Sequence, residues 1–180
     1  MARRDSAPRR YAEAAFEIGL RDGTVEAWRA ELEGAASTLQ SAELSEALAN
    51  PAIPVQQRAD IVGGVFADLG EPVRNLILLL LKRGRIRQLP RVAAEFRRLD
   101  DKRNNIVHAT ATSAAPLDDA ELRAITARLE QMSGSQVALE TAVDPDLIGG
   151  IVVRIGDSLI DGSVRGRLER LRNQLASGAL

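Results

Sequence analysis

Apolar residues recur at intervals of three and four along the first hundred residues, and polar residues fill most positions between them. This is the spacing of helices that bury one face and expose the other. The clearest stripe runs through five apolar side chains, Val25, Trp28, Leu32, Ala35 and Leu39. Glycine, asparagine and proline interrupt the pattern at short intervals, which predicts six helices joined by brief connections.

The pattern changes after Asn105. Residues 106–113 alternate between two faces and are rich in β-branched side chains, which predicts a strand. A helical stripe follows between Pro116 and Gly134, and three more segments with strand character come after it, at 137–143, 151–155 and 158–161. A final helical stripe ends the chain. The order β-α-β-β-β-α predicts a small mixed sheet with helices.

Together, the two patterns predict an α+β protein. We expect an N-terminal six-helix bundle over residues 1–105, followed by a small C-terminal mixed α/β domain over residues 106–180. The last helix begins after Gly162-Ser163 and carries one apolar seam, formed by Val164, Leu168, Leu171 and Leu175. Because an amphipathic helix gains most of its stability by burying its apolar face, we expect this seam to pack against the sheet.

The predicted helix after Pro72 is unusually apolar. Leu76 to Leu81 form an unbroken apolar run, so apolar side chains point all around the helix axis. A helix of a small bundle normally exposes a polar face. Either this helix is central in the bundle or its outer face is covered by another protein, and the pattern leaves both interpretations open. Six residues fall far short of the ~20 that cross a bilayer, so we expect no membrane insertion.

The amino-acid composition excludes several kinds of functional site. The chain has 180 residues, a formal net charge of −1, a single histidine and no cysteine. These values exclude disulfides, thiolate metal sites and multi-histidine metal sites, and they give no overall positive field for nucleic acid. His108 lies on a predicted strand without an obvious acidic partner, which favours a structural role. We therefore expect no catalytic, cofactor-binding or metal-binding residues and no enzymatic activity.

The segment 144–150 has the composition of a turn. Its two aspartates resemble the start of a calcium loop, but Ile148 occupies the next ligand position. Asp-Pro and Gly-Gly pairs are typical of turns, so we interpret this segment as architectural. Gly156-Asp157 is interpreted as a hairpin turn for the same reason. The residues assigned to these structural turns are Asp144, Gly149, Gly150 and Gly156.

A second class of function is considered for residues 82–103, which hold nine basic and three acidic residues. In this alternative the protein is a helical RNA-binding or regulatory adaptor that uses the basic segment. Solvated helix faces and helix C-termini, where cations are favoured, account for the same charges. No aromatic stacking platform accompanies them, and this weakens the RNA-binding alternative.

A long, ordered pattern in the C-terminal part of the chain supports a more specific hypothesis. It consists of Val143, Asp144, Leu147, Gly149, Gly150, Val153, Arg154 and Gly156. Three shorter matches lie upstream, at Arg10-Tyr11-Ala12, Asn50-Pro51 and Arg83-Gly84-Arg85. Across essentially its whole length the chain resembles the F-type ATP synthase delta subunit family, whose mitochondrial counterpart is the oligomycin-sensitivity-conferring protein.

This resemblance implies a non-catalytic stator subunit without a cofactor, attached peripherally to the cytoplasmic face of the bacterial cell membrane as part of the ATP synthase. The N-terminal domain is implied to bind the N-terminal segments of the alpha subunits in the catalytic head. The C-terminal domain is implied to bind b-type subunits of the peripheral stalk, so that ion-driven rotation is coupled to ATP synthesis. Neither nucleic acid nor direct membrane insertion is implied. The resemblance places the head-binding groove on the first and fifth helices, at Tyr11, Ala14, Ile18, Leu76, Leu80 and Arg83.

Overall fold

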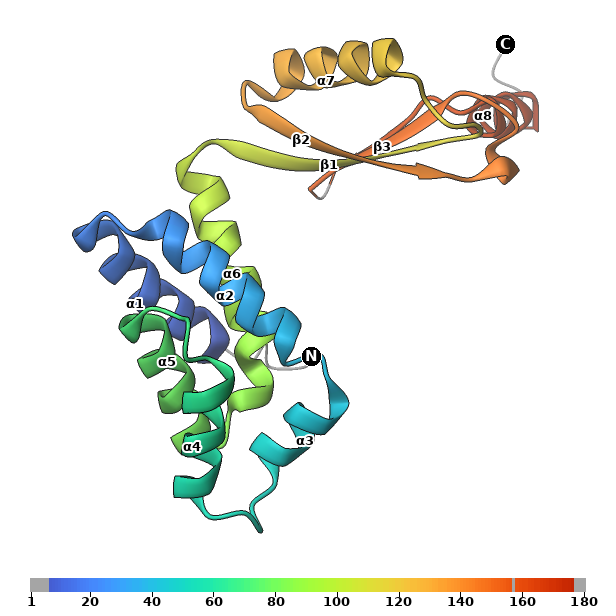
Figure 1. The fold of residues 1–180 in the computed structure, drawn as a ribbon. Helices are drawn as coiled ribbons and strands as arrows, with labels where there is room; N and C mark the ends of the chain where they lie inside the picture. Colours follow the sequence, from blue (N-terminus) through green and yellow to red (C-terminus); the bar gives the residue numbers. More distant parts are fainter. Residues whose placement is uncertain (1–6, 157, 177–180) are drawn as a thin grey trace. The chain divides into compact units, whose positions relative to one another are not determined.

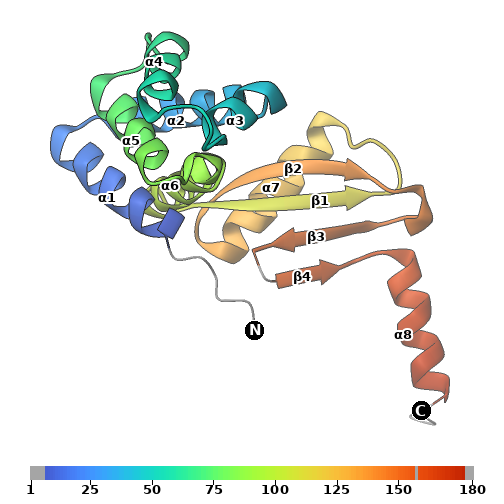
Figure 2. The same ribbon diagram turned by 90° about the horizontal axis from the view of Figure 1, so that it is seen from below.

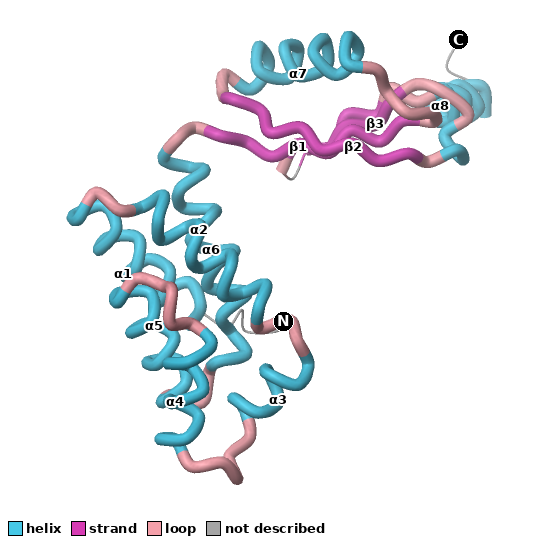
Figure 3. Tube along the Cα trace, viewed as in Figure 1, coloured by secondary structure: helices cyan, strands magenta, loops and turns pink. Residues whose placement is uncertain are grey.

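The computed structural model describes residues 7–156 and 158–176, and Asp157 of the expected hairpin turn lies outside the described residues. The chain divides into two compact units, Met1–Asp100 and Asp101–Leu180. Helices make up the first unit, whereas the four strands of the described chain lie in the second (Figures 1 and 3). The predicted α+β class is therefore confirmed.

The N-terminal unit is built from consecutive helices joined by short connections (Figure 1). These are α1 (Ala7–Asp22), α2 (Val25–Thr38), α3 (Ala42–Ala49), α4 (Val55–Val65), α5 (Glu71–Lys82), the short 3₁₀ helix η1 (Ile86–Gln88) and α6 (Leu89–Arg103). Proline lies at the first turn of α5, where its missing N–H costs no hydrogen bond. The predicted boundaries at Asn50-Pro51 and Gly84 coincide with helix ends.

Every helix from α1 to α6 contributes to one apolar core. At its centre the ring of Phe96 stacks on Trp28 with the ring centroids 6.1 Å apart, and the edge of Phe16 meets Phe96 at 5.4 Å. The apolar run of α5 supplies four buried side chains, Leu76, Ile77, Leu80 and Leu81. The first of the two interpretations therefore accounts for most of this helix, which is packed inside its own unit, and only Leu79 is left well exposed.

The C-terminal unit is a four-stranded sheet with two helices. Its elements are β1 (Ile106–Ser113), α7 (Asp119–Ser133), β2 (Gln136–Val143), the 3₁₀ helix η2 (Pro145–Leu147), β3 (Ile151–Ile155), β4 (Ser158–Asp161) and α8 (Val164–Ala176). The strand order is β2-β1-β3-β4 (Figure 2). β1 pairs parallel with β2 and antiparallel with β3, and β4 pairs antiparallel with β3.

α7 makes the crossover between the two parallel strands and covers one face of the sheet (Figure 1). Where it meets the sheet, Leu129 of the helix forms a small core with Ala109, Ala111 and Val153. The helix begins with a capping box, because the Asp118 side chain accepts from the backbone N–H of Glu121 and the Glu121 side chain accepts from that of Asp118. This reciprocal pair satisfies two donors that a helix start otherwise leaves unpaired.

The apolar seam of α8 does not pack against the sheet, so the prediction made from its periodicity is wrong. The helix extends away from the end of the sheet (Figure 2), and Val164, Leu168, Leu171 and Leu175 are between 41% and 60% exposed. The physical reason is that α7 already covers the core face of the sheet. An amphipathic pattern shows that a helix has an apolar face, but it does not show which surface covers that face.

Candidate functional site

A cavity of about 340 Å³ lies between α1 and α5. Its walls are almost entirely apolar, and Trp28 of α2 lies beside them. The complete lining is Tyr11, Ala14, Ala15, Ile18, Trp28, Pro72, Asn75, Leu76 and Leu79. In α1 the spacing of these residues is three and four, which puts them on one helix face. The cavity is thus a gap along a helix pair, of the kind that can receive another apolar element.

A second cavity, of about 430 Å³, continues the first toward the start of α1. It is lined by Ala7, Arg10, Tyr11, Ala14, Leu79 and Arg85. Tyr11, Ala14 and Leu79 line both cavities, so together these form one groove, called here the α1–α5 groove. The start of α1 and the end of α5 meet at the same end of this groove, which shows that the two helices run antiparallel.

The end of α5 directs the chain back to the groove at Arg85. Gly84 adopts a left-handed conformation, with φ of 64°. The N–H of Arg85 donates to the carbonyl of Leu80 at 2.8 Å, and that of Gly84 donates to Leu81 at 2.9 Å. This pair of bonds is the Schellman arrangement that ends many helices, and glycine is favoured because it has no Cβ to resist the positive φ. Arg83, the last residue before the turn, is exposed but does not line the groove.

Four of the six expected groove residues lie together in the structure: Tyr11, Ala14, Ile18 and Leu76. Leu80 is 0% exposed and belongs to the core, so it supports the groove from below without facing it. The exposed leucine on this wall is Leu79, which is 41% exposed. Sequence reasoning missed Leu79 because the unbroken apolar run of α5 does not distinguish its faces. The sequence signal that could have identified Leu79 is its position on the helix, three residues after Leu76 and four after Asn75.

The C-terminal unit also has an exposed apolar surface. A cavity of about 620 Å³ lies where the β1–α7 connection and the start of α7 meet residues 148–151. Its apolar lining includes Leu117, Ile125 and Ile151, and the strongly exposed Ile148 lies at its edge. The exposed seam of α8 begins beside it, because Val164 lies next to Gly149. Apolar surface therefore continues from this cavity onto α8.

The segment 144–150 is held by hydrogen bonds within the unit. Asp144 accepts from the backbone N–H of Asp146 at 3.0 Å and starts η2. The carbonyl of Gly149 accepts from the N–H of Val164 at 2.9 Å, so the segment is joined to the start of α8. Gly150 has φ of 78°, and a Cβ on it would lie 2.5 Å from the carbonyl oxygen of Gly162. These contacts favour the architectural interpretation of Asp144, Gly149 and Gly150. Gly156 has φ of 52° between β3 and β4.

His108 has an acidic partner that the sequence does not reveal. Its Nε2 lies 2.7 Å from Oδ2 of Asp101, a buried residue in the last turn of α6. The pair joins the end of that helix to β1. Within residues 7–156 and 158–176, no group of three or more histidine, aspartate and glutamate side chains could hold a metal ion.

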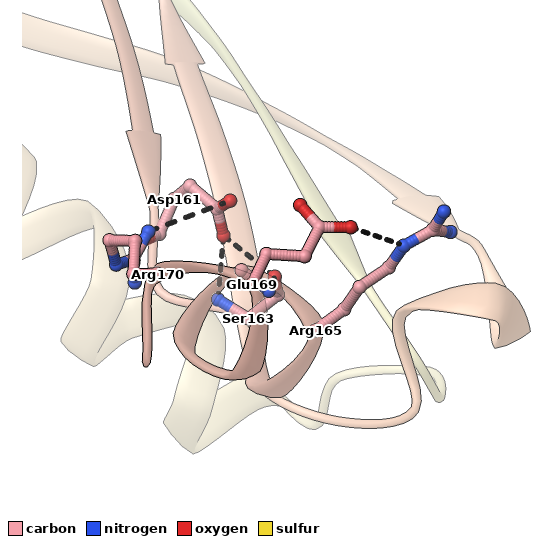
Figure 4. Close-up of polar contacts among 6 residues, drawn as sticks. Asp161, Ser163, Arg165, Glu169 and Arg170 are labelled. Atoms are coloured by element: carbon pink, nitrogen blue, oxygen red, sulfur yellow. Dashed lines mark hydrogen bonds and ion pairs between the residues drawn. The ribbon is translucent and has the colours of Figure 1, made fainter. Parts of the chain in front are cut away.

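The start of α8 is stabilised by a compact polar network (Figure 4). Oδ1 of Asp161 accepts from the backbone N–H of Ser163 at 2.9 Å and from its hydroxyl at 2.7 Å. The Ser163 Oγ in turn accepts from the N–H of Gly166 at 3.0 Å, as a helix cap does. The hydroxyl and backbone bonds from Ser163 hold the pKa of Asp161 below its ordinary value, with a smaller contribution from Arg170.

This network predicts acid sensitivity at the start of α8. Because the folded pKa of Asp161 is lowered, its stabilising contribution is present above the unfolded pKa of about 3.9 and is lost as the pH falls through the lower folded value. We expect the amide resonances of Ser163 and Gly166 to titrate with a midpoint below 3.9. In Asp161→Asn, which keeps an acceptor but cannot titrate, this transition should disappear. A transition that persists in the variant would assign it to another group.

No helix among the described residues is long and apolar enough to cross a membrane.

An α+β chain with an apolar groove on one unit and an exposed apolar seam on the other has the features of a protein that binds other proteins. Comparison with known proteins shows the family to which the chain belongs. The model of the family described as "ATP synthase delta (OSCP) subunit" matches residues 7–175. The chain belongs to this family.

Individual relatives agree over nearly the full length. The chain is 35% identical over 173 residues to ATP synthase subunit delta of Geobacter sp. (strain M21), with 94% of this chain and 96% of the relative covered. It is 40% identical over 174 residues to the same subunit of Anaeromyxobacter sp. (strain Fw109-5), with 94% and 97% covered. A chain in the cryo-EM structure of the Toxoplasma gondii mitochondrial ATP synthase hexamer has 25% identity and a TM-score of 0.66, with 94% and 97% covered. The chain is accordingly a non-catalytic stator subunit of an ATP synthase.

Proposed function

We propose that this chain joins the catalytic head of the ATP synthase to the peripheral stalk through two separate surfaces. The α1–α5 groove binds the N-terminal segments of the alpha subunits, and the C-terminal unit binds b-type subunits. The observation that carries the proposal is the groove itself, which is an open apolar cleft on a unit whose helices otherwise share one apolar core. In this proposal, the head-binding domain is a six-helix bundle over residues 1–105, and the stalk-binding domain spans residues 106–180.

The dimensions of the groove suit a helix. Its lining on α1 extends from Ala7 to Ile18, a distance of about 16 Å at the rise of an α-helix, which corresponds to three turns of a partner. Ala14 lies near the middle of this wall, and its small side chain lets a partner backbone approach closely. Ile18, Leu76 and Leu79 supply apolar area, which stabilises an interface by roughly 25 cal/mol per Å² buried. An amphipathic helix docked in an apolar groove is a recurring mode of recognition.

The stalk-binding surface is proposed to centre on α8. Its leucine seam is exposed, although a helix of this length is marginally stable without a covered face. Arg165, Arg167, Arg170 and Arg172 line the rest of the helix. Stalk helices of this family are long and charged, so carboxylates on them can pair with these arginines. Such exposed pairs contribute only about 0–1 kcal/mol each, so the leucines carry most of the affinity.

With one surface on the head and the other on the stalk, the chain resists rotation of the head while the rotor turns. Ion flow through the membrane sector then drives ATP synthesis. The same proposal places the subunit at the cytoplasmic face of the bacterial cell membrane, held there by its partners. The basic segment 82–103 spans the end of α5, η1 and α6, and family membership favours the stator function over the RNA-binding adaptor.

The proposal is tested by disabling one surface at a time in the full chain. Leu168→Asp combined with Leu171→Asp should weaken binding to purified b-type subunits by more than about tenfold, because two carboxylates would be buried without partners. Binding of the alpha N-terminal peptide should not change. Met132→Asp, on an exposed position of α7, is the matched control and should leave both affinities unaltered. Loss of alpha binding in the α8 variant, or unchanged stalk binding, would contradict the separation of the two surfaces.

A further inference from the structure

The α1–α5 groove differs in charge between its two ends. The end near Ile18 and Pro72 is lined by uncharged residues. The opposite end, near Ala7, is lined by Arg10 and Arg85. No acidic residue is among the described residues that line either cavity. The groove is therefore an apolar surface that terminates at two cations.

Both arginines are available to a ligand. Both side chains are exposed, and among the described residues neither side chain has a hydrogen-bond or ion-pair partner. The carboxylate of Glu13, one turn along α1 from Arg10, pairs with Arg9 instead, accepting a hydrogen bond from its Nε at 2.7 Å. Arg85 is held at the mouth of the groove by the turn that ends α5, and Arg10 projects from a regular helix. The backbone of each residue is fixed, and both side chains line the same cavity, so their two guanidinium groups can together bind a carboxylate.

From this asymmetry we infer that the groove accepts its helix in one direction only, with the acidic first turn of the partner at Arg10 and Arg85. The inference rests on the proposed function, because it assumes that a helix occupies the groove. Acidic residues stabilise the first turn of a helix through the helix dipole, so a carboxylate placed there favours both the helix and the contact. Since Arg10 lies near the start of α1, the bound helix runs parallel to α1 and antiparallel to α5.

The direction can be tested with two synthetic peptides of about 18 residues, which form five helical turns. Both carry the same apolar face and the same net charge. One has a Glu pair in its first turn and a Gln pair in its last turn, and in the other these pairs are exchanged. Affinities are measured by calorimetry for the full chain, for Arg10→Glu/Arg85→Glu, and for the control Arg91→Glu/Arg97→Glu. The control alters two exposed arginines of α6 that do not line the groove.

We expect the unaltered chain to prefer the first-turn-Glu peptide by about two- to thirtyfold, the range for two exposed ion pairs. The preference should disappear or reverse in Arg10→Glu/Arg85→Glu and persist in the control. Because the two peptides differ in helicity when free, the change in their affinity ratio between protein variants is the decisive quantity. An unchanged ratio in Arg10→Glu/Arg85→Glu overturns the inference, and so does a preference for last-turn Glu that depends on these arginines.

Failure of the inference is distinguishable from failure of the proposed function. If Leu79→Asp abolishes binding of both peptides while the charge-reversed variant keeps the ratio of the unaltered chain, the groove is the binding site and only the direction is wrong. If Leu79→Asp leaves both affinities unchanged, the groove is not the binding site, and both the proposed function of the groove and the inferred direction of the helix are wrong. High salt provides a further readout, because the preference should shrink as exposed charges are screened.

Discussion

Replacing Leu79 by aspartate is expected to weaken binding of the alpha N-terminal peptide by well over tenfold while the N-terminal unit stays folded. Leu79 lines both cavities of the groove and is 41% exposed, so the unbound protein tolerates a polar side chain there. In the proposed complex the same position is covered. The variant then loses the burial of the exposed part of the leucine, roughly 0.6–1.2 kcal/mol, and must also bury a carboxylate without a partner. Calorimetric titration measures the loss, and circular dichroism checks the fold.

Two control variants distinguish a loss of groove binding from a general effect of the added charge and from unfolding. Val55→Asp places the same charge at the start of α4, on a residue that is 45% exposed and outside the groove, and should leave peptide affinity unchanged. Leu80→Asp places it in the core, one residue from Leu79, and should unfold the unit. Fluorescence of Trp28, the single tryptophan, should respond to peptide binding because its side chain lies beside the cavity. If Leu79→Asp and Val55→Asp bind the peptide equally well, the groove is not the head-binding surface.

Gly150→Val is expected to unfold or strongly destabilise the C-terminal unit, lowering its free energy of unfolding by more than about 3 kcal/mol. Two effects add at this position. A β-branched residue is strained at a φ of 78°, and its Cβ would lie 2.5 Å from the backbone oxygen of Gly162. Backbone cannot move aside as the end of a flexible side chain can. Thermal unfolding followed by NMR should show loss of the sheet while the resonances of the helical unit remain.

Gly134→Val separates these two effects. Gly134 ends α7 at a φ of 67°, but a Cβ built there has no neighbour within 4 Å among the described residues. It therefore carries the conformational cost alone, about 1–2 kcal/mol. The difference between the two variants measures the close approach of the 144–150 turn to the start of α8. Equal destabilisation by the two substitutions would show that this packing contributes nothing.

Local pattern predicted the elements of this fold well because each is specified by its own residues. The strand Ile106–Ser113 was predicted with its observed bounds, since an alternating β-branched run between turn residues has few other solutions. Periodicity also placed Tyr11, Ala14 and Ile18 on one face of α1, where they line the groove. Residue type and spacing carried this information directly.

What the sequence did not specify depends on tertiary packing. Apolar residues surround the axis of α5, so only the position of its neighbours decides that Leu80 is core and Leu79 faces the groove. The seam of α8 has the same pattern as a buried helix face, yet it is exposed because α7 already covers the apolar face of the sheet. The Asp101 partner of His108 depends on how the end of α6 approaches β1. In all three cases the missing information was the identity of the neighbouring surface.

The central position of β1 has a mechanical consequence for a subunit that holds a rotary machine in place. β1 follows α6 after only two residues, and its eight residues are paired with β2 in parallel, while five of them are also paired with β3. A pull on the chain at Asn105 that is resisted at the start of α8 acts along this strand, because β4, which leads into α8, runs parallel to β1. It therefore loads the hydrogen bonds of both ladders in shear. The bonds share the tension and must break together, whereas an edge hairpin pulled at its open end would unzip one bond at a time.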